Sequence, residues 1–137
     1  MIIVDDHLAL LAIAGRLPDL GDRGPVVTTC CFQFRMARAV SDSGRSGRLS
    51  RRVADPMVAS QRVLHPPANR LVVLDPRSSM DDTVRVALTH RANLLLAELV
   101  GAAVSRQASI RLTRANVGRS WPAVMEAEGV DLAIIDV

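Results

Sequence analysis

Two neighbouring carboxylates follow directly after a short apolar run at the start of this 137-residue sequence. The run is Ile2–Val4, and the acids are Asp5 and Asp6. A run of β-branched residues predicts a buried strand, which these acids leave at its carboxyl end. In open α/β sheets, ligands bind outside the carboxyl ends of the strands. The two aspartates are therefore the first candidates for chemistry.

Glu98 is a second candidate, because it lies in the apolar stretch LLLAELVGAAV. On a helix it shares a face with Leu95 and Gly101, so it is either buried or at the rim of the apolar face. A buried carboxylate needs a partner, a proton or a metal ion. An aspartate at a strand end and a glutamate on a crossing helix can share a hard divalent cation such as Mg²⁺. Only one of the two aspartates can face such a site, and the other is expected to cap the next helix.

Thr113 and Asn116 follow a third predicted strand, SIRLT, and would lie at the same edge of the sheet. Their side-chain oxygens can orient a metal-bound water or serve as a further ligand. Turn chemistry explains a threonine and an asparagine at these positions equally well. The sequence carries no phosphate-binding loop, no dinucleotide fingerprint and no G-x-S-x-G motif. Its three histidines have no metal-ligand spacing.

Strands and helices alternate along the chain and must position these residues. Strands are expected at 2–4, 26–27, 71–74, 109–113 and 130–137. Helices are expected at 7–15, from a Thr28 or Thr29 cap to about 40, at 78–104 as one long helix or two, and at 122–129. This order predicts an α/β protein with three layers, α/β/α, around a mostly parallel central sheet. The chain is expected to form a single domain over residues 1–137.

The basic residues are seventeen arginines and no lysine, for a net charge of +3. This charge permits binding to nucleic acid without requiring it. The polar segment 41–52 is the best candidate for phosphate contact, and a solvated linker is the alternative. Its arginines are Arg45, Arg48, Arg51 and Arg52.

Composition favours a cytoplasmic protein. With 49% apolar residues, the chain should fold. No apolar stretch reaches the length of a membrane span, and the acids interrupt the only N-terminal apolar run. Cys30 and Cys31 are neighbours, so they are expected to be free thiols, which suit a reducing compartment.

These residues resemble the PIN-domain family, in particular the VapC-like toxin ribonucleases. IIVDDHLALL is similar to the opening strand, acidic residue and leucine-rich helix of the family. LLAELVGAAV followed by SIRLT is similar to its later acidic helix and to the strand that ends in threonine. The resemblance covers nearly the whole chain. It implies a three-layer fold, Mg²⁺ or Mn²⁺, cleavage of RNA, dimerisation and an antitoxin protein as partner.

The resemblance also implies roles for individual residues. Asp5 corresponds to the first metal acid, and Glu98 to the third, where aspartate is more usual. Thr113 and Asn116 fall near the last positions of the family's site. Asp6 would then contact the metal ligands without binding the metal itself.

The chain departs from the family at the second acid, a glutamate on the helix after the second strand. Here that helix reads CCFQFRMARAV and offers Gln33 and Arg35. Two functions follow from this departure. One is a metal-dependent ribonuclease, the toxin of a toxin–antitoxin pair. The other is a PIN-like scaffold with a degenerate site that binds RNA or protein.

Overall fold

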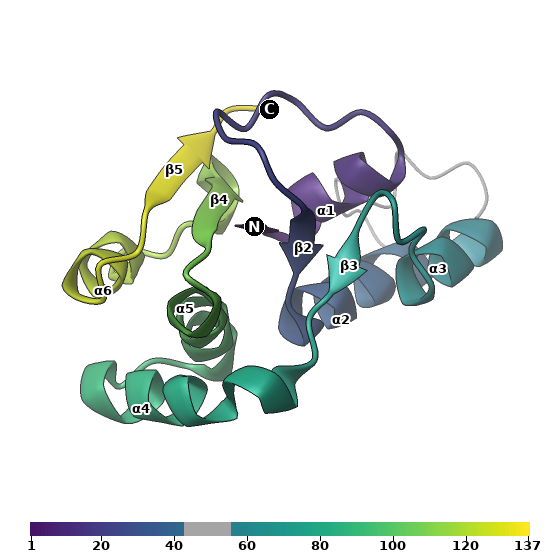
Figure 1. The fold of residues 1–137 in the computed structure, drawn as a ribbon. Helices are drawn as coiled ribbons and strands as arrows, with labels where there is room; N and C mark the ends of the chain where they lie inside the picture. The colour runs from purple at the N-terminus through teal and green to yellow at the C-terminus, as the bar shows by residue number, and fades with distance from the viewer. Residues whose placement is uncertain (43–55) are drawn as a thin grey trace.

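A five-stranded sheet forms the centre of the computed structural model, which describes residues 1–42 and 56–137 (Figure 1). The strand order is β3-β2-β1-β4-β5, and every neighbouring pair is parallel. The predicted α/β class with a parallel central sheet is thereby confirmed. The strands are β1 (Ile2–Val4), β2 (Val26–Thr28), β3 (Val72–Val73), β4 (Ser109–Thr113) and β5 (Leu132–Ile135).

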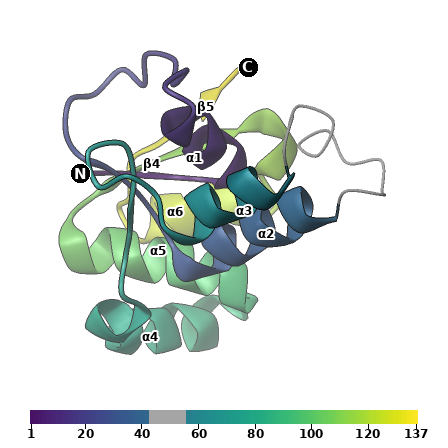
Figure 2. The same ribbon diagram turned by 90° about the vertical axis from the view of Figure 1, so that its right-hand side faces the viewer.

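Helices cover both faces of the sheet (Figure 2). Helices α1, α2 and α3 build the core on one face, and α5 and α6 build it on the other, with Phe32 of α2 and Val86 of α4 also packing into the second core. Helix α4 packs against the outer side of α5, as Figure 1 shows. The helices are α1 (Asp6–Ile13), α2 (Cys30–Ser41), α3 (Pro56–Leu64), α4 (Met80–His90), α5 (Leu94–Arg106) and α6 (Trp121–Ala127), with short 3₁₀ helices η2 (Pro76–Ser79) and η3 (Arg114–Asn116).

Strand β1 is buried on both faces. Ile2 and Val4 pack into the core beneath α1, and Ile3 packs into the core beneath α5. Successive side chains of a strand point to opposite faces, so an all-apolar run is what a central parallel strand requires. The burial of β1 fixes the place at which the next two residues, the acids, leave the sheet.

The segment 78–104 forms two helices, which settles one of the two alternatives. Arg91 ends α4 in a left-handed conformation with φ of 49°. Asn93 then caps α5 by accepting a hydrogen bond from the backbone of Leu96 at 3.0 Å. Gly101 allows the two helices to lie close together, because a Cβ there would be 2.6 Å from backbone atoms of Thr83. This packing holds the second half of α5 under the sheet.

Most other predicted boundaries hold within a few residues. Thr29 caps α2, as expected, by accepting from the backbone of Phe32. Strand β3 is shorter than its apolar run predicts, and η3 is an element that the sequence does not predict. None of the helices within the described ranges is both long enough and apolar enough to span a membrane.

Candidate functional site

The carboxyl ends of β1 and β4 meet at the point where the strand order reverses. From β1 the chain builds the sheet outward through β2 and β3, and then returns to place β4 on the other side of β1. The register sets Val4 beside Arg111, and β4 continues two residues further to Thr113, so the residues that follow β1 lie beside the end of β4. Such a switch point is where open α/β sheets bind ligands. The residues that follow β1 and β4 therefore share one edge, as the sequence predicts.

Asp5 is completely buried, and protein donors occupy both oxygens of its carboxylate. Oδ1 accepts from the backbone of Leu8 at 2.9 Å, so Asp5 caps α1. Oδ2 accepts from the backbone and the hydroxyl of Thr113, both at 2.7 Å, and from the side-chain amide of Asn116 at 2.9 Å. These four donors satisfy a buried carboxylate. Asp5 thus ties the start of α1 to the end of β4.

Asp6 presents an oxygen to a charged side chain. Its Oδ1 accepts from the backbone of His7 at 3.0 Å and from Asn116 Nδ2 at 2.7 Å. Its Oδ2 lies 3.3 Å from Nε of Arg35. Burial raises the pKa of Asp6 above its ordinary value, while the Arg35 guanidinium opposes that rise. Burial therefore disfavours the negative charge of Asp6, and the guanidinium of Arg35 covers Oδ2 of its carboxylate.

Arg35 reaches this edge from α2. Its Nη2 donates to Oδ1 of Asn116 at 3.2 Å, so the guanidinium bridges Asp6 and Asn116. The guanidinium also lies over the ring of Phe32, with Cζ 5.7 Å from the ring centre. Only 6% of the Asp6 side chain is exposed, against 41% of the Arg35 side chain. The cation thus lies at the mouth of the site and the acid lies inside it.

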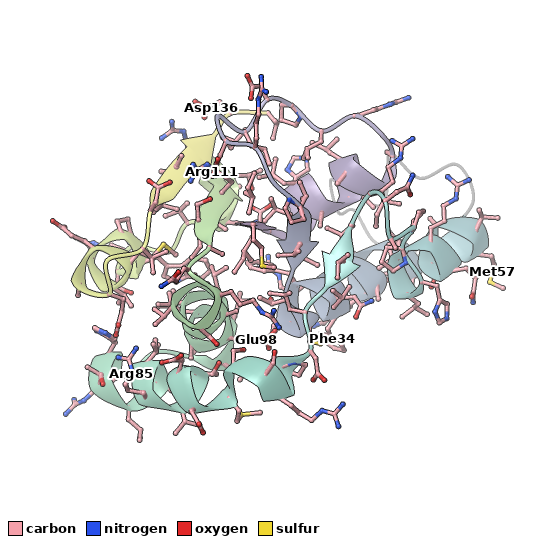
Figure 3. All side chains as sticks on the ribbon, in the orientation of Figure 1. Phe34, Met57, Arg85, Glu98, Arg111 and Asp136 are labelled. Carbon is pink, nitrogen blue, oxygen red and sulfur yellow. The ribbon has the colours of Figure 1, made fainter. Side chains whose placement is uncertain are left out.

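Glu98 is a buried residue of α5 (Figure 3), and its partner is Cys31 in the first turn of α2. Its carboxylate accepts from the backbone of Cys31 at 3.2 Å and from the Cys31 thiol at 3.0 Å. A carboxylate is favourable here because the N-terminus of a helix carries partial positive charge. Burial, together with this hydrogen bond, raises the pKa of Cys31 to about 12. Both cysteines are free thiols, as expected.

Gln33 serves the fold and not the site. Its Nε2 donates to the backbone carbonyls of Val63 and Leu64, at 3.1 and 3.3 Å, near the end of α3. These carbonyls have no partner within their own helix, so the glutamine satisfies them. Of Gln33 and Arg35, only Arg35 contacts an aspartate.

The structure brings four of the predicted site residues into one hydrogen-bonded group: Asp5, Asp6, Thr113 and Asn116. In the hydrogen bonds of the described residues, Glu98 contacts α2 and shares no partner with Asp5. The sequence did not predict the contact of Arg35 with Asp6, although a buried acid without a partner is itself a signal that a cation is close. The arginines Arg45, Arg48, Arg51 and Arg52 lie outside the described residues.

The oxygens that face Arg35 suit a hard cation in kind. Mg²⁺ binds through one or two protein oxygens and keeps several waters. Asp6 Oδ2 and Asn116 Oδ1 supply such a pair, and they already lie around a guanidinium. Among residues 1–42 and 56–137, no three His, Cys, Asp or Glu side chains are grouped to hold a metal ion. A metal at this edge would therefore rely on one carboxylate, one amide oxygen and water.

The site combines two buried acids, a hydroxyl and an amide at a switch point, and an arginine at its mouth. No family model matches the chain, and no curated protein matches its sequence.

Proposed function

We propose that this chain is a metal-dependent endoribonuclease of the PIN type, similar to the VapC toxins, with its site at the carboxyl ends of β1 and β4. The observation that carries the proposal is the group in which Asp5 and Asp6 share the side-chain amide of Asn116. A carboxylate pair at a switch point is chemistry that phosphodiester-cleaving sites use with Mg²⁺ or Mn²⁺.

The residues of the group divide the work. Asp6 and Asn116 would hold the cation through their side-chain oxygens. When bound, the cation would polarise the phosphodiester and lower the pKa of a bound water. Asp5 acts as a positioning residue, because its four hydrogen bonds fix α1, Thr113 and Asn116 relative to one another. Glu98 holds the first turn of α2, the helix that carries Arg35.

RNA is the proposed substrate because the chain has an excess of positive charge, carried entirely by arginine. Arginine contacts phosphate bidentately and stacks on bases. Arg45, Arg48, Arg51 and Arg52 remain the proposed phosphate contacts. With the PIN resemblance we also propose an antitoxin protein as partner, a homodimer and a cytoplasmic location.

The test is cleavage of single-stranded RNA by the purified full chain in the presence of MnCl₂. We expect wild type to cleave and Asp6→Asn to be slower by at least about a hundredfold, a loss typical of removing a transition-state-stabilising group. Asp6→Asn keeps the side-chain size, which makes it a cleaner variant than Asp5→Ala. The latter would leave buried donors of Leu8 and Thr113 without an acceptor and would destabilise the fold.

A matched control is Asp81→Asn, which removes an exposed carboxylate in the first turn of α4. It should cleave as well as wild type. If folded wild type cleaves no RNA with Mn²⁺, or if Asp6→Asn cleaves as fast as wild type, the ribonuclease proposal is wrong.

The contact between Arg35 and Asp6 favours a second candidate function. If Arg35 permanently neutralises the acid, the protein is a PIN-like scaffold without nuclease activity that binds RNA or protein. This candidate predicts no stabilisation by divalent metal. A ligand that binds only the native state must raise the unfolding temperature. A rise with MnCl₂ in wild type that is lost in Asp6→Asn would therefore exclude the scaffold.

A further inference from the structure

The guanidinium of Arg35 lies where a metal ion would have to bind. It contacts Oδ2 of Asp6 through Nε at 3.3 Å and Oδ1 of Asn116 through Nη2 at 3.2 Å. These are oxygens of two different residues that converge on one positive charge. A hard divalent cation seeks the same two kinds of atom.

The side chains that carry these two oxygens are held in place by hydrogen bonds of their other atoms. Asp6 Oδ1 accepts from His7 and from Asn116 Nδ2, and the same Nδ2 also donates to Asp5. Removal of the guanidinium would break none of these contacts. The position between the two oxygens is thus shaped by Asp5, Asp6 and Asn116, and Arg35 only fills it.

Arg35 itself is held weakly. Its contacts with the two oxygens are longer than the 2.7–2.9 Å or so typical of charge-assisted hydrogen bonds. Its side chain is 41% exposed and rests on the ring of Phe32. An arginine at the mouth of a site can turn into solvent, where water replaces its hydrogen bonds, whereas the buried acid cannot.

We infer that Arg35 is an internal competitor for the divalent cation, so that the guanidinium and the metal occupy the same two oxygens in turn. This inference rests on the proposed function, because it concerns regulation of the same site. Metal binding then requires Arg35 to leave Asp6. The affinity of the protein for metal is lowered because only molecules in which Arg35 has left Asp6 can bind the ion. In the absence of metal, the guanidinium of Arg35 balances the negative charge of Asp6.

The experiment is calorimetric titration of the full chain with MnCl₂ alone. We expect Arg35→Gln to bind Mn²⁺ at least about tenfold more tightly than wild type, which corresponds to about 1.4 kcal/mol at 25 °C. The matched control Arg38→Gln removes an exposed arginine one turn further along α2 and should bind like wild type. Adding Asp6→Asn to Arg35→Gln should abolish the gain, which locates the bound ion at Asp6.

Arg35→Lys provides a second variant of conserved charge. Lysine is a single point charge and cannot bridge two oxygens as the planar guanidinium does. We expect an Mn²⁺ affinity between those of wild type and Arg35→Gln, with circular dichroism confirming the native fold of each variant.

The outcomes separate this inference from the ribonuclease proposal. Tighter binding by Arg35→Gln supports the inference even if no variant cleaves RNA. Equal binding by wild type and Arg35→Gln overturns the inference and leaves the nuclease standing if wild type cleaves. If neither wild type nor Arg35→Gln binds Mn²⁺, the proposed competition between Arg35 and metal and the metal-dependent ribonuclease are both wrong.

Discussion

Asn116 connects the two aspartates through one side-chain amide. Its Nδ2 donates to Asp5 and to Asp6, while its Oδ1 accepts from Arg35. An aspartate at this position could accept from Arg35 but could not donate to either acid. The asparagine thus allows two buried carboxylates to lie side by side without a bound metal.

Asn116→Asp should test this role. In the absence of metal we expect it to destabilise the fold by about 3 kcal/mol, because two buried carboxylates lose a donor and gain a negative neighbour. With MnCl₂ present, the variant should recover more stability than wild type, since a third acid strengthens the cation position. Thermal unfolding with and without MnCl₂ measures both effects.

Asn93→Asp is the matched control, because Asn93 is the N-cap of α5 and aspartate serves equally well there. It should change the unfolding temperature little and respond to Mn²⁺ like wild type. A variant Asn116→Asp that is as stable as wild type without metal would contradict the role given to the amide.

Helix α2 links the site to both cores of the protein. Its first turn receives the carboxylate of Glu98 from α5, and Gln33 reaches the end of α3. Arg35 lies on a different side of the same helix and contacts Asp6. Neighbouring elements therefore fix the rotation of α2 about its axis, and that rotation decides which residue faces the acids.

Glu98→Gln should make the Cys31 thiol more reactive. The Glu98 carboxylate contributes to the raised pKa of Cys31, after burial, by accepting its hydrogen bond and by its negative charge. Removing the charge lowers this pKa, and each unit of decrease raises the thiolate fraction about tenfold. Alkylation by iodoacetamide at fixed alkaline pH, in a Cys30→Ser background, should be correspondingly faster.

The pH profile of alkylation distinguishes this effect from unfolding. A lowered pKa shifts the profile toward lower pH, whereas loosened structure raises the rate at every pH. Glu126→Gln, an exposed change on α6, should leave the profile of wild type unchanged. A profile in Glu98→Gln identical to that of wild type would show that the carboxylate does not act on the thiol.

At the scale of the whole molecule, Asp6 and Glu128 contribute to the pH dependence of stability with opposite signs. Hydrogen bonds from Arg85 and His90 lower the pKa of Glu128, so its charge stabilises the fold above the ordinary value of 4.5. This stabilisation is lost as pH falls through the lowered pKa of the folded state. The raised pKa of Asp6 has the opposite sign: its protonation on acidification favours the folded state.

Glu128→Gln should therefore be less stable than wild type at neutral pH, with a difference that shrinks as the pH falls below 4.5. Urea unfolding at neutral pH and at several acidic values measures the difference. Glu126 lies in α6, whose C-cap residue is Glu128, and it lacks the contacts described for Glu128, so Glu126→Gln should match wild type at each pH. A gap between Glu128→Gln and wild type that stays constant with pH would contradict the linkage.

Most of the architecture follows from local sequence, whereas the contacts inside the site do not. Apolar runs such as Ile2–Val4 and capping residues such as Thr29 act over a few positions, so they predict elements and their order. The contact of Glu98 with Cys31 joins positions 67 residues apart. It depends on how two helices pack, which periodicity does not specify. For the same reason, the sequence does not indicate whether Gln33 or Arg35 contacts an aspartate.

The opposite directions of Gln33 and Arg35 constrain how this protein can change over time. Two positions along a helix turn the side chain by about 200°, so these neighbours serve different partners. An acid at position 33 would meet the carbonyl oxygens of Val63 and Leu64 and repel them. Position 35 opens onto Asp6 and Asn116, and in the contacts described Arg35 otherwise meets only the ring of Phe32 on its own helix. A substitution at position 35 alone can therefore change the charge of the site while the fold stays the same.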